Sequence, residues 1–251
     1  MLLDNTSAIV TGGASGLGAA TARALAGTGA RVFALDLKAG IDRADDVEGV
    51  EYVATDVTEP EQVRAAVTRA ADAGPLRTVV NCAGIAPSAR ILGKKGVHDL
   101  ELYASVVRIN LIGSFNVLAL AAEHLAATDP DEQGQRGVVL NTASIAAYDG
   151  QVGQAAYASS KGGIVGLTLP AARDLAQYGI RVCTIAPGIV ETPMLATVSE
   201  EIRAGLAAGV PFPQRLARPE EYARLALAII DHDYLNGEVI RMDGALRMPP
   251  R

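Results

Sequence analysis

The stretch AIVTGGASGLGAATARALA, residues 8–26, decides the fold, because it runs from an apolar strand through a glycine-rich turn into a helix. Gly12, Gly16 and Gly18 stand at the turn. Glycines there let the backbone approach a pyrophosphate, and the helix N-terminus offers free N–H groups to phosphate oxygens. The motif predicts a dinucleotide site, although a glycine turn without a ligand is an alternative that the motif alone leaves open.

The second predicted strand, residues 31–36, ends on Asp36. A carboxylate at that position hydrogen-bonds the ribose hydroxyls of the adenosine and repels a 2′-phosphate. NADP sites usually carry an arginine or lysine nearby, and the candidate positions here hold Ser15 and Leu37. The sequence therefore predicts NAD as the cofactor, with an ordinary strand-end aspartate as the alternative.

Short apolar runs alternate with helical patterns along almost the whole chain. The strand candidates are residues 7–11, 31–36, 51–55, 78–81, 137–142, 181–185 and 238–242. The helical stretches are residues 16–27, 60–72, 100–127, 155–178 and 219–231. This alternation predicts an α/β fold with right-handed crossovers. We expect one Rossmann-type domain, residues 1–251, with a doubly wound parallel sheet of about seven strands and helices on both faces.

Local signals refine this arrangement. Thr58 is the expected cap of a helix with Pro60 in its first turn, and Pro170 is expected to kink the helix that contains it. Residues 190–215 interrupt the strand–helix alternation after a strand, where open α/β sheets build substrate sites. Residues 86–103 form a second candidate segment for substrate binding.

Composition argues against nucleic acid as a partner. The net charge is −6, aromatic residues make up 4%, and no block of basic residues is present. Hydrophobic residues make up 49%, enough for a sizeable core.

The cysteines and histidines indicate neither a disulfide framework nor a metal site. Cys82 and Cys183 each lie in an apolar run, so both thiols are expected to be buried. Two buried thiols in a chain of this size are typical of a protein from a reducing compartment. His98, His124 and His232 lie far apart and are expected at the surface. The N-terminus leaves no room for a signal peptide, and no stretch looks long enough to cross a bilayer, so we expect a soluble cytoplasmic protein. An import signal that had already been removed would leave no trace.

Further motifs follow in order along the chain. The turn spacing T-G-x-x-x-G-x-G, residues 11–18, precedes NCAG at 81–84, NTAS at 141–144, YASSK at 157–161 and PGIVETPM at 187–194. This combination resembles the short-chain dehydrogenase/reductase family over nearly all 251 residues. Within the family, residues 134–188 and YLNGEVIRMDGA, residues 234–245, look closest to type II 3-hydroxyacyl-CoA dehydrogenases, which also oxidise hydroxysteroids.

The resemblance implies a catalytic set of Asn110, Ser144, Tyr157 and Lys161. Tyr157 and Lys161 lie one helical turn apart, so both side chains reach the same helix face. A free tyrosine, with a pKa of about 10, is a poor base at neutral pH. The charge of Lys161, together with the positive nicotinamide of NAD⁺, is expected to lower the pKa of Tyr157. Taken alone, the pair could also be an exposed helix pair or a coincidence.

Ser144 and Asn110 have less specific surroundings. Ser144 follows a strand, and its hydroxyl is expected to hold the substrate oxygen, with a turn cap as the alternative. Asn110 is expected to hold a water that links Lys161 to solvent, with an ordinary helix-side amide as the alternative.

The family pattern carries over to a set of cofactor contacts in which Asp56 and Val57 flank the adenine and Lys161 holds the nicotinamide ribose. The set is Gly12, Ser15, Gly16, Leu17, Gly18, Asp36, Asp56, Val57, Asn81, Ala83, Gly84, Tyr157, Lys161, Pro187, Gly188, Val190 and Thr192. Val57 and Ala83 could equally be plain core residues.

The substrate contacts are expected to be Ser144, Gln154 and Tyr157. Lys94 and Lys95 are candidate contacts for CoA phosphates, with a solvated loop tip as the alternative.

The resemblance implies NAD-dependent oxidation of (S)-3-hydroxyacyl-CoA to 3-ketoacyl-CoA. The alternatives are a dehydrogenase of hydroxysteroids or other secondary alcohols, and an NAD-binding sensor or scaffold without turnover. A reductase of acyl-carrier-protein substrates would usually need NADPH and a basic docking patch. The resemblance also implies a homotetramer, formed partly through the helices at 100–127 and 155–178.

Overall fold

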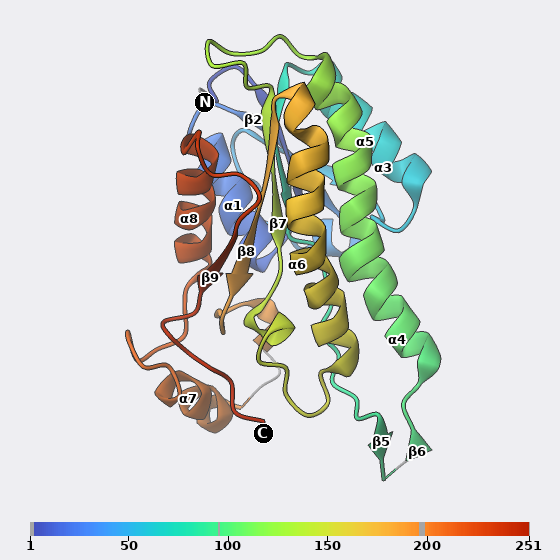
Figure 1. The fold of residues 1–251 in the computed structure, drawn as a ribbon, viewed down its shortest axis with the longest axis vertical. Coiled ribbons are helices and arrows are strands. Elements are labelled where there is room, and N and C mark those ends of the chain that lie inside the picture. Colours follow the sequence, from blue (N-terminus) through green and yellow to red (C-terminus); the bar gives the residue numbers. More distant parts are fainter. Residues whose placement is uncertain (1–2, 95, 196–198, 251) are drawn as a thin grey trace.

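The computed structural model describes residues 3–94, 96–195 and 199–250. Its centre is a parallel seven-stranded sheet in the order β3-β2-β1-β4-β7-β8-β9 (Figure 1). The strands are β1 (Ser7–Thr11), β2 (Arg31–Asp36), β3 (Val50–Ala54), β4 (Leu76–Asn81), β7 (Gly137–Thr142), β8 (Ile180–Pro187) and β9 (Val239–Met242). The predicted doubly wound sheet is confirmed, with strand ends that differ by one or two residues, the usual uncertainty of such boundaries.

Helices cover both faces of the sheet (Figure 1). The helices α1 (Gly16–Ala26) and α8 (Pro219–Asp231) pack on one face, and α3 (Pro60–Asp72), α5 (Ser114–Ala127) and α6 (Ala155–Leu175) pack on the other. Successive strand residues serve opposite faces, so that Ile9 packs under α3 and α5 while its neighbour Val10 packs under α1 and α8. Since both faces are buried, the strands read as continuous apolar runs.

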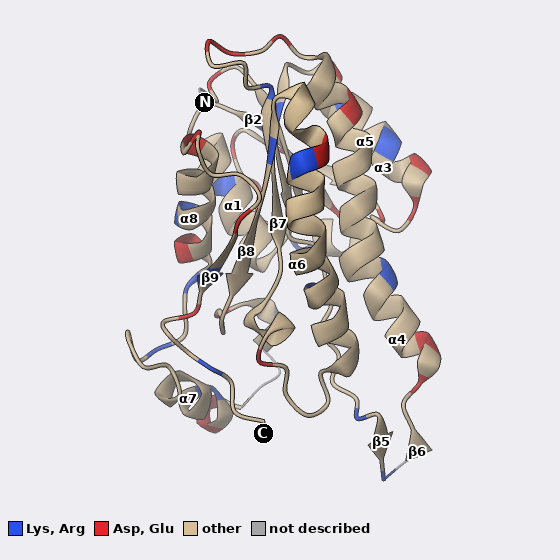
Figure 2. Ribbon diagram, in the orientation of Figure 1, with Lys and Arg blue, Asp and Glu red and all other residues tan. Residues whose placement is uncertain are grey.

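The two segments expected to bind substrate contain structure that the sequence did not predict. Residues 86–103 include an antiparallel hairpin of β5 (Leu92–Gly93) and β6 (Gly96–Val97), which projects away from the helices (Figure 1). Its tip carries a basic residue (Figure 2), which is Lys94, whereas Lys95 lies outside the described residues. Residues 190–215 include α7 (Glu200–Ala208).

The helix predicted over 100–127 is continuous but irregular. It consists of α4 (Leu100–Val107), a π-helical stretch (Arg108–Gly113) and α5. It is long and apolar enough to span a bilayer, with a mean hydropathy of 1.5 over its most apolar part, so the expectation that no stretch reaches this length is wrong. The helix packs against α3, α6 and β4, and apolar composition is also what such packing requires.

The cap expected for α3 is also wrong. The residue that precedes the helix is Glu59, and Pro60 occupies the first turn as predicted. The hydroxyl of Thr58 instead donates to Asp56 Oδ1 over 2.8 Å, because the aspartate folds back in the turn after β3.

The remaining elements are short: α2 (Lys38–Ile41) and 3₁₀ turns at Ile145–Ala147, Ala176–Tyr178 and Pro193–Leu195. Helix α6 stays helical through Pro170, and the kink expected there stays a prediction. Cys183 is buried in β8, Cys82 follows β4, and both thiols are free.

Candidate active site

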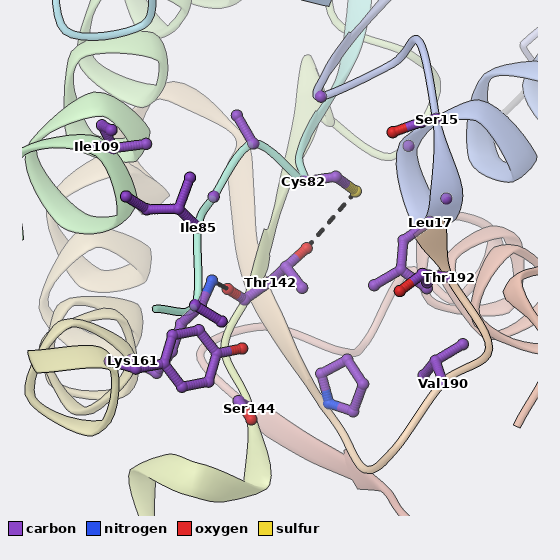
Figure 3. Close-up of a pocket in the computed structure, with 18 of the residues that line it drawn as sticks. Ser15, Leu17, Cys82, Ile85, Ile109, Thr142, Ser144, Lys161, Val190 and Thr192 are labelled. Carbon is purple, nitrogen blue, oxygen red and sulfur yellow. Dashed lines mark hydrogen bonds between the residues drawn. The ribbon is translucent and has the colours of Figure 1, made fainter. Parts of the chain in front are cut away.

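A cavity of about 690 Å³ opens at the carboxyl ends of the strands. The sheet order reverses between β1 and β4, which is where open α/β sheets bind ligands. Most predicted site residues line this cavity: Gly12, Ser15, Gly16, Leu17, Gly18, Asp36, Asp56, Val57, Ala83, Gly84, Ser144, Gln154, Tyr157, Lys161, Pro187, Gly188, Val190 and Thr192. Figure 3 shows Ser15 and Leu17 across the cavity from Ser144 and Lys161.

The glycine turn forms one end of the cavity. Gly12 has a φ of +65°, and a Cβ there would lie 2.9 Å from the backbone N of Ala83. A Cβ on Gly18 would lie 2.1 Å from the carbonyl oxygen of Gly12, so no other residue fits. Ser15 precedes α1, the first turn holds no acidic residue, and the Ser15 side chain makes no capping bond in the described structure. The first N–H groups of α1 therefore face the cavity without a side chain to satisfy them, which fits a bound pyrophosphate.

Asp36 lies at the end of β2 and is held in place by the backbone. Its carboxylate accepts hydrogen bonds from the N–H of Ala14 over 3.0 Å and of Leu37 over 2.8 Å. Lys161 is the one cation among the described residues that line the cavity. Lys38, nearby in sequence, instead pairs with Asp42 over 2.5 Å on the surface of α2.

The opposite end of the cavity holds the tyrosine and lysine of α6. Lys161 Nζ donates to the carbonyl oxygen of Thr142 over 2.7 Å and lies 5.8 Å from the centre of the Tyr157 ring. Figure 3 shows the bond between Lys161 and Thr142. Burial lowers the pKa of Lys161 from its ordinary value of 10.5 to about 8.

The predicted lowering of the Tyr157 pKa depended on Lys161 together with a bound nicotinamide, and the protein side chains alone give the opposite direction. Burial raises the pKa of this phenol, and a hydrogen bond from Ser144 lowers it only in part. The ammonium of Lys161 lies 5.8 Å from the centre of the ring, and burial disfavours its charged form. The side chains of the protein by themselves therefore do not lower the pKa of Tyr157.

A family model described as short chain dehydrogenase matches residues 6–203. The match covers the glycine turn, Asp36, and the Tyr157 and Lys161 pair. The chain belongs to the short-chain dehydrogenase family. The resemblance inferred from the motifs is confirmed, and the family makes the protein an oxidoreductase that uses a nicotinamide cofactor.

Relatives match this short-chain dehydrogenase along nearly its whole length. The chain is 53% identical over 249 residues to 3-hydroxyacyl-CoA dehydrogenase type-2 of Bos taurus, covering 97% of this chain and 95% of that protein. It is 51% identical to the protein of the same name in Drosophila melanogaster, covering 99% and 100%. The crystal structure of 3-hydroxyacyl-CoA dehydrogenase type-2 from Mycobacterium avium superposes with a TM-score of 0.92 at 44% identity, covering 98% of each chain.

Ser144 fills the capping role that was the alternative from the sequence, and its role toward the substrate oxygen stays a prediction. Its hydroxyl accepts a hydrogen bond from the N–H of Ala146 over 3.1 Å and so caps the 3₁₀ turn at Ile145–Ala147. The same side chain lines the cavity and hydrogen-bonds Tyr157. The cap holds the hydroxyl where it can meet a substrate oxygen.

Asn110 lies in the π-helical stretch of this dehydrogenase and is not among the described residues that line the cavity. Its side-chain oxygen accepts from the N–H of Ile85 over 2.8 Å, and its amide donates to the Ile85 carbonyl and to Ser160 Oγ. These bonds fix the loop after β4, next to Gly84 and near Lys161. The expected role of Asn110 in holding a water stays a prediction.

Asn81 is likewise not among the described lining residues, although it was expected to contact the cofactor. It is buried in β4, and its amide donates to Asn141 Oδ1 over 2.9 Å and to the Ser114 carbonyl over 3.3 Å. Its side chain therefore ties β4 to β7 and to the helix above them.

Some of the predicted substrate contacts line the cavity and others do not. Gln154 lines the cavity, and its side-chain oxygen accepts from the N–H of Gln151 over 3.0 Å. Lys94 lies on the projecting hairpin and does not reach the described cavity wall. Among the described residues of 86–103, only Ala86 lines the cavity, whereas the described part of 190–215 contributes Val190, Thr192, Pro193 and Leu195.

Sequence reasoning missed several lining residues, most of them apolar: Leu35, Thr55, Cys82, Ile85, Ile109, Thr142, Ala143, Ile145, Ala146, Ile189 and Met248. Several are immediate neighbours of predicted residues, so the strand-end motifs could have found them. Met248 had no such signal. It reaches the cavity because the chain end folds back, with the N–H of Val152 donating to the carbonyl of Pro250 over 3.0 Å.

Proposed function

We propose that the protein is an NAD-dependent dehydrogenase that oxidises (S)-3-hydroxyacyl-CoA to 3-ketoacyl-CoA. The observation that carries the proposal is the grouping of Tyr157, Lys161 and Ser144 at one end of a cavity with Asp36 at the other. The choice of substrate is supported by the names of the relatives at 51–53% identity over nearly the full chain.

NAD is favoured over NADP by the charges of the cavity wall. The carboxylate of Asp36 would accept bonds from ribose hydroxyls and would repel a 2′-phosphate. The glycine turn and the start of α1 would hold the pyrophosphate, and Lys161 would hold the ribose next to the nicotinamide. Bound there, a nicotinamide would supply the hydride acceptor for the substrate carbon, and its positive charge would favour ionisation of Tyr157.

Tyr157 is the proposed general base. The substrate hydroxyl loses its proton to the Tyr157 oxygen as the carbon–oxygen double bond forms. The Ser144 hydroxyl donates a hydrogen bond to the same substrate oxygen and orients it. Because burial raises the pKa of Tyr157, oxidation should accelerate as the pH rises toward the pKa of the tyrosine in the complex.

The test follows NADH absorbance with purified protein, NAD⁺ and (S)-3-hydroxybutyryl-CoA, in parallel with NADP⁺ and with a hydroxysteroid. We expect rapid NADH formation with the acyl-CoA and at least a hundredfold loss of kcat in Tyr157→Phe, because general base catalysis contributes about 10²- to 10⁴-fold. Turnover of a different alcohol alone would retain the mechanism and reject the substrate. NADH binding without turnover of any alcohol would favour the sensor or scaffold.

We also propose a homotetramer. Ile112 and Phe115 on the long helix, and Leu169 on α6, expose 47%, 49% and 44% of their surface, which supports packing of these helices against a second copy. Light scattering of the purified protein tests the assembly, and a monomer would reject it. A cytoplasmic location is a proposal supported by the two free thiols, and cell fractionation tests it.

A further inference from the structure

Three side chains from distant parts of the chain form a closed ring at the wall of the cavity, where Cys82 and Thr142 line it and Tyr222 lies behind them. The hydroxyl of Tyr222 on α8 lies 2.6 Å from Thr142 Oγ1. Thr142 Oγ1 also lies 3.6 Å from Cys82 Sγ, and Cys82 Sγ lies 3.7 Å from the Tyr222 hydroxyl. Each group has one proton to donate and can accept one, so the three bonds close a cycle. Figure 3 shows the bond between Thr142 and Cys82.

The ring acts on the residue that holds Lys161. Thr142 is the last residue of β7, and its carbonyl accepts the bond from Lys161 Nζ over 2.7 Å. On one side β7 is paired to its end, with Thr142 opposite Ile185 of β8. On the other side the ladder to β4 stops one residue earlier, at Asn141. The ring therefore restrains Thr142 on the side where strand pairing no longer does.

Tyr222 is suited to this task because water does not reach it. It is fully buried and is not among the described residues that line the cavity. Burial raises the pKa of Tyr222 well above its ordinary value, so the hydroxyl stays protonated and remains a donor. Phenylalanine at this position would fill the same space without the hydrogen bond to Thr142. Packing alone therefore does not account for the presence of a hydroxyl here.

We propose that Tyr222 is a positioning residue for Lys161, acting through the side chain and then the carbonyl of Thr142. The inference rests on the proposed role of Lys161 in holding the nicotinamide cofactor. Removal of the Tyr222 hydroxyl takes the 2.6 Å partner away from Thr142 Oγ1 and leaves it only the 3.6 Å contact with Cys82 Sγ. The end of β7 is then less restrained on the side of β4, and the Thr142 carbonyl that accepts the bond from Lys161 shifts.

The experiment compares Tyr222→Phe with Thr184→Val. Thr184 and Thr168 form another buried hydroxyl pair at 2.6 Å, between β8 and α6, and the side-chain hydrogen bonds described for this pair do not include Thr142. Each substitution removes one hydroxyl at nearly constant volume. NADH fluorescence measures cofactor affinity, urea unfolding measures stability, and steady-state kinetics separates KM for NAD⁺ from kcat.

We expect both variants to lose similar stability, and only Tyr222→Phe to bind NADH about tenfold more weakly, the effect of one displaced charged hydrogen bond. The KM of Tyr222→Phe for NAD⁺ should rise as its NADH affinity falls. Equal NADH affinity in wild type, Tyr222→Phe and Thr184→Val would overturn the inference and leave the proposed function intact. Failure of the wild-type protein to bind NADH would overturn the proposed function, and the inference with it.

A second variant covers the case in which Tyr222→Phe does not fold. Thr142→Val removes the partner of the Tyr222 hydroxyl at nearly constant volume and keeps the backbone carbonyl that accepts the bond from Lys161. A loss of NADH affinity similar to that of Tyr222→Phe, about tenfold, is expected because the same hydrogen bond is removed. Unchanged affinity in this variant would overturn the inference.

Discussion

Asp36 carries the choice between the two nicotinamide cofactors as a single residue. Its carboxylate is fixed by two backbone N–H groups, and the neighbouring Leu37 lines the cavity with 56% of its surface exposed. The double variant Asp36→Ala/Leu37→Arg is expected to lower kcat/KM for NAD⁺ about 10- to 100-fold, the effect of losing bonds to a charged group. The same variant should raise kcat/KM for NADP⁺, because arginine pairs with a 2′-phosphate.

Asp42→Asn is the control for this prediction, because it removes a carboxylate from nearby α2 that pairs only with Lys38 among the described contacts. Steady-state kinetics with both cofactors measures the outcome. An unchanged cofactor ratio in the double variant would contradict the assignment of Asp36.

Lys161 makes stability depend on pH in a specific direction. Burial lowers its pKa to about 8 in the folded protein, against 10.5 ordinarily. Between these values the unfolded chain binds the extra proton, so the folded protein gains stability as the pH rises. Relative to Lys161→Met, wild type should gain on the order of 2 kcal/mol in unfolding free energy from pH 8 to pH 10.

Urea unfolding at several pH values measures this difference, and Lys38→Met controls for the loss of one positive charge at an exposed site. A parallel pH dependence in wild type and Lys161→Met would mean that Lys161 keeps an ordinary pKa.

At the scale of an element, α8 is fixed at its start by Glu221. The carboxylate accepts two bonds from the Arg215 guanidinium, each 2.7 Å, and one from the N–H of Arg218 over 2.9 Å. These bonds lower the pKa of Glu221 to about 2. Glu221→Gln should lower the unfolding free energy by about 1 kcal/mol at pH 7, a modest value because the pair is partly exposed.

The pH dependence of this effect follows from the lowered pKa. The stabilisation is complete above the ordinary pKa of 4.5 and is lost as the pH falls through about 2. In urea unfolding at pH 7, 4 and 3, the difference in unfolding free energy between wild type and Glu221→Gln should therefore become smaller as the pH falls. Glu220→Gln, exposed in the same first turn, is the control. A constant difference at all pH values would contradict the role of the carboxylate.

At the scale of the whole molecule, the chain end closes the cavity. Arg241 of β9 bonds Asp149 over 2.6 Å and the Leu246 carbonyl over 3.2 Å. Beyond it, the carbonyls of Pro249 and Pro250 accept bonds from Gln151 and Val152, and Met248 lines the cavity. Ending the chain after Leu246 should raise KM for the acyl-CoA several-fold through the lost cavity wall, while NADH affinity changes less than twofold.

Steady-state kinetics and NADH fluorescence on the shortened protein measure these two quantities. Equal losses of both would indicate general unfolding, and an unchanged KM would show that Met248 does not face the substrate.

The sequence by itself determined the features that depend on near neighbours. The strand, glycine turn and helix over residues 7–26 follow from the apolar runs and from the lack of room for a side chain at Gly12 and Gly18. Tyr157 and Lys161 share a face because the helix repeats over that spacing. The order of strands and helices along the chain then allows one doubly wound sheet.

Tertiary structure decided what depends on residues far apart in the chain. Asn110 hydrogen-bonds Ile85, and Asn81 hydrogen-bonds Asn141. Met248 lines the cavity. All three contacts form because the fold brings distant segments together. The pKa of Tyr157 rises because burial outweighs the hydrogen bond with Ser144. Tyr222 meets Thr142 across 80 residues of chain. Hydrogen-bond direction and desolvation arise from the packed surroundings, and no local pattern of residues specifies those surroundings.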